Sequence, residues 1–411
     1  MNKIQQLIQQ YCPNGVEFKE LGEVVKIQRG VRVVRNQLLK DGKYPVYQNS
    51  MKPLGYFEKY NYKANTTFII SAGAAGDVGY SDVDFWAADD CFLCICRDNL
   101  RSKFLYYILL CNQTYLYSRV RRASVPRISR EAISKLQIPI PPLQIQQEIV
   151  KILDSFTQLE AELEAELEAR RAQYEYYRNQ LLNATEVSGK WLMNGVEVEW
   201  KTLGEVGEFV RGSGLQKNDF TKNGVGCIHY GQIYTFYGFS ANKTKSFVSP
   251  ELATKLRKAK KGDLVIATTS ENIEDVCKAV VWLGNEEICI SGETYIFKHT
   301  QNAKFIAHYL RTPLFLDFKK QNRTGTKVIR VHGDKLKKFQ IPIPPIAEQN
   351  RIVEILDKFD SLVNDISIGL PAEIDGRRKQ YNYYRGKLLD FKPMVSDKRL
   401  VVNENPLTIN H

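Results

Sequence analysis

The chain has 411 residues, of which 43% are hydrophobic and 25% charged, as in an ordinary soluble globular protein of two or three domains. No run approaches the roughly 20 apolar residues of a membrane-spanning helix, and the N-terminus lacks the apolar region of a signal peptide, so we expect no membrane association. The net charge of +12 favours an acidic partner such as nucleic acid, although a basic protein without such a partner would have the same charge.

The chain begins with a short predicted helix, residues 2–12, which ends at Pro13-Asn14-Gly15. The segment GVEFKELGEV (15–24) then reappears as GVEVEWKTLGEV (195–206), which marks an internal repeat. Short strand patterns separated by Gly, Asn and Asp follow each copy and predict a compact β-rich domain with some helix. The clearest are YPVYQNS, TTFIISAGAAGDVGYS and DDCFLCIC in residues 24–96, and GCIHYGQIYTFYGF, GDLVIATTS, KAVVWLG and EICISGETYIFKH in residues 205–300.

Three of the eight cysteines, Cys91, Cys94 and Cys96, alternate with apolar residues in CFLCIC. A metal site at Cys91-x-x-Cys94 would need a second pair at matching spacing, which is missing, so a buried strand is the better interpretation. Free thiols and the lack of a secretion signal favour the reducing cytoplasm.

Each half continues with a predicted helix, residues 101–122 and 302–323, a Pro-rich stop, residues 138–142 and 341–345, and a long helical arm. Apolar residues in the first arm follow a 4-3-4-3-4 spacing from Ile145 to Leu163, which is typical of a coiled-coil seam. A further step of four to Leu167 is a stutter that relaxes the supercoil. The tetrads AELEAELEA (161–169) place their glutamates on a face that we expect to be solvated.

The second arm is longer than the first by four residues, about one helical turn or ~6 Å. It also contains Gly369-Leu370-Pro371, where we expect a break or kink. Two amphipathic helices of like pattern bury their seams most economically on each other, so we expect them to pack antiparallel. The residues that we assign to the spacer and to partner contacts are Leu159, Leu163, Leu167, Tyr174, Tyr177, Leu181, Leu362, Ile366, Tyr381, Tyr384 and Leu388.

No catalytic signature is present. There is no phosphate-binding loop, no H-E-x-x-H, no amino-methyltransferase element, and no histidine pair at helical spacing. Glu274-Asp275-x-x-Lys278 resembles a nuclease fragment, but a solvated turn explains it better. The sequence therefore indicates a binding module that lacks an active site of its own.

Basic residues gather at matching places in the two halves, residues 97–130 and 302–338, which predicts phosphate contacts, with a solvated helix face as the alternative. Gly-flanked polar loops are candidates for base reading, because Gln, Asn, Arg and Lys match base edges in the major groove, although such loops are often simple turns. The candidate DNA-binding residues are Arg29, Gln48, Asn49, Ser50, Ser71, Arg121, Arg122, Arg127, Arg211, Gln216, Lys217, His229, Tyr230, Gln232, Thr269, Ser270, Arg323 and Lys327.

The double QIPIPP boundary, ILDSF and ILDKF, the AELE tetrads, and RRAQYEYYR with RRKQYNYYR together resemble the specificity (S) subunit of type I restriction–modification enzymes, in the subfamily with tetrad repeats in the central spacer helix. The resemblance implies an α+β fold with two pseudo-symmetric β-rich target-recognition domains joined by two long antiparallel coiled-coil helices. The implied segments are a first recognition domain (1–140), a spacer helix (141–185), a second recognition domain (186–344), a C-terminal helix (345–390) and a tail (391–411).

The same resemblance implies a non-catalytic cytoplasmic subunit that reads a bipartite, asymmetric site in double-stranded DNA. Two methyltransferase (M) subunits and the restriction/motor (R) subunits would be its partners. The chain itself would carry no cofactor, and S-adenosylmethionine, ATP and Mg would belong to the partner subunits. One additional AELE unit should lengthen the spacer by ~6 Å, on the order of two base pairs.

Two alternatives stay open from the sequence. One is a DNA-recognition subunit of a different restriction or methylation system, which neighbouring genes would reveal. The other is a coiled-coil adaptor that binds only protein, which predicts no salt-dependent affinity for DNA.

Overall fold

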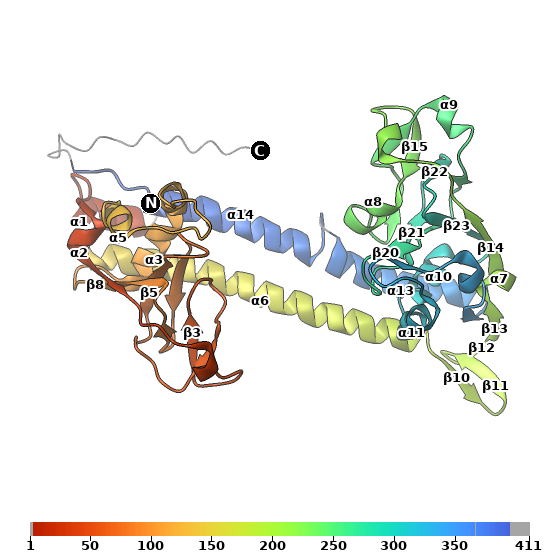
Figure 1. Ribbon diagram of the computed structural model, residues 1–411, viewed down its shortest axis with the longest axis horizontal. Helices are drawn as coiled ribbons and strands as arrows, with labels where there is room; N and C mark the ends of the chain where they lie inside the picture. The colour runs from red at the N-terminus through yellow and green to blue at the C-terminus, as the bar shows by residue number, and fades with distance from the viewer. Residues whose placement is uncertain (1–2, 366, 395–411) are drawn as a thin grey trace. The chain divides into compact units, whose positions relative to one another are not determined.

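The computed structural model describes residues 3–365 and 367–394, which belong to two compact units (Figure 1). Unit 1 is Met1–Glu164 with Glu373–His411, and unit 2 is Ala165–Ala372. The division falls inside two helices, α6 (Leu143–Leu181) and α14 (Leu370–Leu389), so each unit contains a β-rich domain together with parts of the long helices. Ile366 and residues 395–411 of the predicted tail lie outside the described residues.

The main sheet of unit 1 is antiparallel, with strand order β2-β8-β5-β6. Alternation along β8 sends Phe92 and Cys94 into the core below the helices and Cys91 and Leu93 into a second core under a smaller sheet, β4-β3-β7. Cys91 and Cys94 therefore lie on opposite faces and cannot share a metal ion. The strands are β2 (Val25–Arg29), β3 (Tyr44–Tyr47), β4 (Gly55–Phe57), β5 (Thr66–Ile70), β6 (Val78–Ser81), β7 (Trp86–Ala87) and β8 (Cys91–Cys96).

Unit 2 repeats this plan with additions. Its main sheet has the order β14-β23-β19-β21-β16, and a second sheet has the order β17-β15-β22-β18. The strands are β14 (Gly207–Arg211), β15 (Val225–Ile228), β16 (Ser240–Ala241), β17 (Ser246–Val248), β18 (Lys258–Ala259), β19 (Leu264–Ala267), β21 (Lys278–Trp282), β22 (Ile288–Ile290) and β23 (Thr294–His299), with a short pair, β20 (Thr269–Ser270) and β24 (Ile329–Arg330).

The start and the end of each domain pair with each other. In unit 1, β1 (Phe18–Glu20) is antiparallel to β9 (Gln137–Pro139), and in unit 2, β13 (Glu199–Thr202) is antiparallel to β25 (Gln340–Ile343). The Pro-rich segments thus form two-stranded ribbons in which the missing proline N–H is tolerated, and they lead directly into the long helices. A three-stranded sheet precedes β13, formed by β10 (Ala184–Val187), β11 (Lys190–Met193) and β12 (Val196–Glu197).

Three predicted segments differ from the structure. The helix expected over 101–122 is two helices, α3 (Ser102–Cys111) and α4 (Gln113–Ser118), and the one expected over 302–323 is α10 (Ala303–Tyr309) and α11 (Pro313–Asn322). Pro313 stands at the first position of α11, where its missing N–H and fixed φ suit a helix start but not a helix interior. The strand-like run GCIHYGQIYTFYGF contains a helix, α8 (Tyr230–Thr235), capped by His229.

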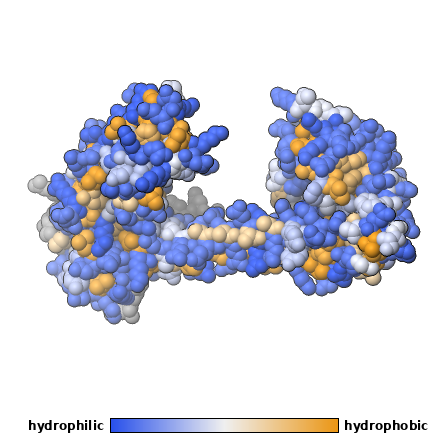
Figure 2. Space-filling model, turned by 90° about the horizontal axis from the view of Figure 1, so that it is seen from below, coloured by the Kyte–Doolittle hydropathy of each residue, from blue (hydrophilic) through white to orange (hydrophobic). Residues whose placement is uncertain are grey.

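The other helices are short, apart from α13. They are α1 (Lys3–Tyr11), α2 (Leu21–Val24), η1 (Arg35–Gln37), α5 (Arg130–Ser134), α7 (Leu203–Val206), η2 (Lys217–Asp219), α9 (Pro250–Ala253), α12 (Gly333–Leu336) and α13 (Ile346–Asn364). No helix in the described ranges is both long enough and apolar enough to span a bilayer. Figure 2 shows hydrophilic side chains over most of the visible face, with hydrophobic side chains in separate small patches.

The long helices pack together within each unit. In unit 1, Phe156 of α6 lies near Tyr381 and stacks on Tyr384 of α14, while Glu160, one turn later in α6, bonds Arg378, which comes earlier in α14. The order of these contacts makes the two helices antiparallel. In unit 2, Tyr174 and Tyr177 of α6 both stack on Phe359 of α13, with ring centroids 6.1 and 5.4 Å apart.

Two expectations about the arms can be compared directly. The break expected near Gly369-Leu370-Pro371 is confirmed, because α13 ends at Asn364 and α14 begins at Leu370. The expectation that the tetrad glutamates face solvent is confirmed, because Glu162, Glu164, Glu166 and Glu168 are all exposed. Arg378 also forms ion pairs with Glu164 and with Glu160, which precedes the tetrads. Glutamates spaced by four residues lie on one helix face, and one guanidinium can therefore reach both.

Candidate DNA interface

A cluster of charged side chains lies at one end of the main sheet of unit 2. Arg211 ends β14, Thr269 belongs to β20 and Arg330 belongs to β24, and all three surround Glu293. The Thr269 hydroxyl donates to Glu293 Oε2 at 2.5 Å, and the guanidinium groups of Arg330 and Arg211 lie 3.6 and 3.9 Å from the same carboxylate. The hydroxyl, followed by the two arginines, lowers the pKa of Glu293. Two half-exposed arginines share one carboxylate, which leaves positive charge for an anion outside.

Arg330 belongs to a loop that has an exact positional counterpart in unit 1. Residues 324–330 close on themselves by mutual backbone bonds between Thr324 and Arg330, of 2.8 and 2.9 Å. Residues 121–127 close in the same way through Arg121 and Arg127, at 2.7 and 3.1 Å. We call these two segments the basic hairpins.

Each basic hairpin is tied to the sheet at the same place. The residue after the hairpin, Ile128 or Val331, donates its N–H to the carbonyl of Ser71 or Thr268, at 3.0 and 3.1 Å. Equal tethering in two domains of diverged sequence indicates a shared task. Arg330 lies in the basic stretch 302–338 that was predicted to contact phosphate, but it is not among the individual candidate residues; aligning VPRIS with VIRVH identifies it.

The polar loops predicted to read bases also occupy equivalent positions. Gln48-Asn49-Ser50 follows β3 in unit 1, and His229 follows β15 in unit 2. Each of these strands has a parallel neighbour in the smaller sheet of its unit: β3 pairs with β7, and β15 pairs with β22. In unit 2 these side chains are partly engaged: His229 Nδ1 accepts from the Gly231 N–H, and Gln232 Nε2 donates to Ser246 Oγ at 2.6 Å. In unit 1, Asn49 is exposed.

The remaining candidate residues divide by exposure. The exposed ones are Arg29, Asn49, Arg121, Arg122, Arg127, Arg211, Gln216, Lys217, Arg323 and Lys327; Gln48, Ser50, Tyr230, Gln232 and Ser270 are half-buried; Ser71, His229 and Thr269 are buried. Burial and then the charge of Lys217 lower the pKa of His229, which favours the neutral ring. The basic side chains are thus exposed to a ligand, whereas the side chains of Ser71, His229 and Thr269 are buried.

The residues assigned to the helices also divide. Tyr174 is buried, Leu163, Leu167, Leu181, Tyr381 and Leu388 are half-buried, and Leu159, Tyr177, Leu362 and Tyr384 are exposed. Leu153 and Val363, which were not predicted, are fully buried. Leu153 packs with Ile145 and Ile149 against the domain of unit 1, so the first turns of α6 bury a face on their own domain.

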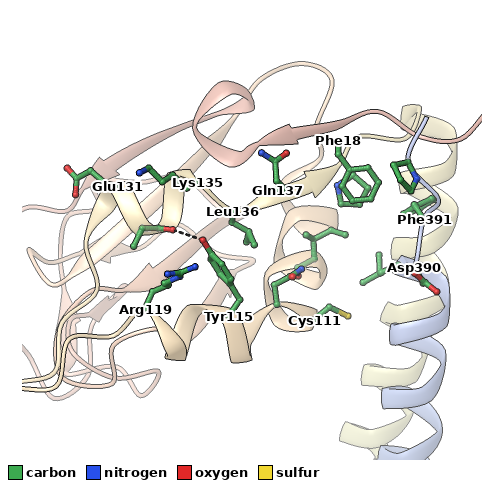
Figure 3. Close-up of a pocket in the computed structure, with 16 residues that line it drawn as sticks. Phe18, Cys111, Tyr115, Arg119, Glu131, Lys135, Leu136, Gln137, Asp390 and Phe391 are labelled. Carbon is green, nitrogen blue, oxygen red and sulfur yellow. Dashed lines mark hydrogen bonds between the residues drawn. The ribbon is translucent and has the colours of Figure 1, made fainter. Parts of the chain in front are cut away.

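A cavity of about 1110 Å³ in unit 1 is lined by Glu131, Lys135, Arg119 and Tyr115 among others, without a nucleophile and base in hydrogen-bond contact. Figure 3 shows Glu131, Lys135 and Arg119 in one part of it and Phe18 and Phe391 near the end of α14. The Tyr115 hydroxyl is bonded to the Ala132 carbonyl at 3.5 Å. Among the described residues, no three His, Cys, Asp or Glu side chains are grouped to hold a metal ion. The fold and these sites define a duplicated binding protein with two basic faces.

The comparisons with known proteins identify the family. Residues 13–169 and 195–375 match the type I restriction modification DNA specificity domain. The chain is 32% identical over 405 residues to a Haemophilus influenzae protein assigned as a type I restriction enzyme specificity subunit, covering 92% of this chain and 96% of that one. It is 36% identical over 326 residues to the specificity subunit of the Escherichia coli enzyme EcoR124I/EcoR124II, covering 75% and 76%. The S subunit of a type I restriction-modification system from M. genitalium has the same fold, with a TM-score of 0.58 at 16% identity over 91% of this chain and 96% of that one.

The chain therefore belongs to the family of type I restriction–modification DNA specificity subunits. The predicted family, the α+β fold and the function as the DNA specificity subunit of such a system are confirmed. Subunits of this family are the non-catalytic part of the enzyme.

Proposed function

We propose that each unit reads one half of a bipartite, asymmetric DNA site, and that the long helices hold the two reading domains apart. The observation that carries this proposal is the pair of basic hairpins, 121–127 and 324–330, which have the same backbone closure and the same attachment to the sheet. Two hairpins that present arginines in the same way suit a ligand with the same charged group at two places, and the phosphates of DNA are such groups.

The contacts divide by chemistry. Arg29, Arg127, Arg211 and Arg330 carry guanidinium groups on exposed surface at equivalent edges of the two sheets and suit phosphates. The loops after β3 and β15 differ between the units in both sequence and conformation, and they suit bases, which differ between the two half-sites.

The proposed boundaries are recognition domains over residues 1–140 and 186–344, a spacer helix over 141–185, a C-terminal helix over 345–390, and a tail over 391–411. The AELE tetrads support the proposal that the chain belongs to the subfamily with tetrad repeats in the central spacer helix. Two methyltransferase subunits dock on the helices and bring S-adenosylmethionine, and the restriction subunits bring ATP and Mg. The complex acts in the cytoplasm, where the substrate DNA is.

A salt titration tests the phosphate contacts. The full chain in complex with methyltransferase subunits is titrated with a fluorescent duplex between 50 and 200 mM salt, roughly the range over which phosphate contacts dominate affinity. For Arg127→Ala and Arg330→Ala, the slope of log affinity against log salt should fall by about 0.9 each, equally for specific and random duplexes. Lys201→Ala, which removes an exposed pair with Glu199 on β13, is the control. An unchanged slope in both arginine variants would remove the hairpins from the interface.

A further inference from the structure

A fully buried glutamine joins the β-rich domain of unit 1 to the first turn of its long helix. Gln146 Nε2 donates to the Asn99 carbonyl at 2.9 Å and to the Pro141 carbonyl at 2.7 Å. Its Oε1 accepts the N–H of Arg101, which is the residue preceding α3, at 2.8 Å. One side chain thus ties together the Pro-rich turn, the start of α6 and the start of α3.

Unit 2 contains the same joint. Gln349 is also fully buried, and its Nε2 donates to the Pro344 carbonyl at 2.8 Å and to Gln301 Oε1 at 2.7 Å. Its Oε1 accepts the N–H of Asn302, the residue preceding α10, at 3.0 Å. All side-chain hydrogen-bonding groups of the two glutamines are used within the protein, so neither is available to a ligand.

A second contact follows eight residues later in each helix. Asp154 of α6 forms an ion pair with Lys103 of α3 at 3.1 Å, and Asp357 of α13 forms one with Lys304 of α10 at 2.6 Å. In unit 1 the Tyr107 hydroxyl also donates to Asp154. Eight residues correspond to ~12 Å along a helix. In unit 1 these polar contacts add to the apolar packing of Ile145, Ile149 and Leu153 on the domain. Because the two polar contacts lie this far apart, each opposes rotation of the domain about the other.

We infer that Gln146 with Asp154, and Gln349 with Asp357, are positioning residues that hold each reading domain at a fixed angle to its helix and thereby set how strictly the DNA spacer length is enforced. This inference rests on the proposed function. A one-base-pair change in spacer moves a half-site by ~3.4 Å. A rigid joint turns that displacement into lost contacts, while a loosened joint lets the domain follow the half-site.

The test uses the full chain in complex with methyltransferase subunits and a set of duplexes with fixed half-sites and spacers one base pair shorter, equal or longer. In Gln146→Ala, Gln349→Ala and Lys304→Ala, methylation at the altered spacers relative to the cognate one should rise by about tenfold, the scale of one or two lost hydrogen bonds. The half-site sequences should stay the same. Lys358→Ala, which removes an exposed pair with Glu354 on the same helix as Asp357, is the matched control and should stay strict.

A merely structural role predicts a different pattern. In that case the melting temperature of the variants falls but the ratio of methylation at altered and cognate spacers does not change, and the inference is overturned. The double variant Lys304→Asp with Asp357→Lys forms the ion pair in reverse. Its methylation at altered spacers, relative to the cognate one, should return to the wild-type level even if the glutamine variants fold poorly. Relaxed spacers in this double variant would also overturn it. If the wild-type complex methylates no two-part site at all, the proposed function itself is contradicted. If the wild-type complex methylates only the cognate spacer and the variants do the same, only this inference is contradicted.

Discussion

Lengthening α6 by one tetrad tests whether this helix measures the distance between half-sites. Inserting Ala-Glu-Leu-Glu into AELEAELEA adds four residues to a helix that is continuous from Leu143 to Leu181. The added length is ~6 Å, and the residues after the insertion rotate by about 40°, because each residue turns the helix by about 100°. The inserted unit repeats its neighbours, so Arg378 still meets two glutamates four residues apart.

The ~6 Å of added helix corresponds to at most about two base pairs of 3.4 Å, and to fewer if the helix is inclined to the DNA axis. We therefore expect the recognised spacer to grow by about one or two base pairs while both half-sites stay unchanged. Methylome sequencing of cells that express the variant with its methyltransferase subunits reports half-sites and spacer together.

A two-residue insertion of Ala-Glu is the control. It adds only ~3 Å but rotates the following residues by about 200°, which turns the buried face of α6 toward solvent. This variant should lose sequence-specific methylation altogether. The reasoning is refuted if the tetrad variant keeps the original spacer or changes a half-site, or if the two-residue variant behaves like the tetrad variant.

Three further predictions concern stability. Leu153→Ala should lower the free energy of unfolding by about 2–5 kcal/mol, because this side chain is fully buried, whereas the exposed Leu159→Ala should change it by less than about 0.5 kcal/mol; denaturant titration compares them. Burial lowers the pKa of His299 to about 4, so the stabilising contribution of its neutral ring is complete above pH 6.5 and is lost as the pH falls toward 4. The free energy of unfolding should therefore fall by about 2 kcal/mol between pH 7.5 and 5, and His299→Phe should abolish this fall, as measured by tryptophan fluorescence in denaturant. An unchanged pH profile in the variant would show that His299 does not cause the pH dependence. Thr202→Ala removes the capping box of α7 and should lower the free energy of unfolding by about 1 kcal/mol. Thr254→Ala should lower it by less, because Thr254 lies at the C-terminal cap of α9, where its hydroxyl donates to the Glu251 carbonyl and satisfies no helix N–H.

The repeat, the long helices and the β-rich domains were predictable because long periodic segments and duplicated boundaries are strong signals. The burial of individual helix residues was not. The seam interpretation assumed that α6 packs only on another helix, but Ile145, Ile149 and Leu153 pack on the domain from which the helix emerges. The periodicity of one helix shows that a face is buried without showing against what.

The charged site was predicted only in part, for a related reason. Exposed arginines could be selected from the sequence, but the closure of each basic hairpin depends on backbone bonds between residues six apart, such as Thr324 and Arg330, which carry no side-chain pattern. His229 and Gln232 were chosen as base readers from their polarity. Their local bonds, to Gly231 and Ser246, give them a role in shaping the loop first.

The positions of the repeated contacts also explain how one scaffold can serve different DNA sequences. In unit 1 the joint to the helix uses residues 99–103 and 141–154, and the basic hairpin is residues 121–127. The loop proposed to read bases lies earlier, after β3, within a segment that touches neither joint residue through a side-chain bond. We therefore expect that replacing the loop after β3 changes one half-site while the angle of the domain, the phosphate contacts and the spacer length stay fixed. The segment that begins at Ser71 must be kept, because the Ser71 carbonyl holds the basic hairpin.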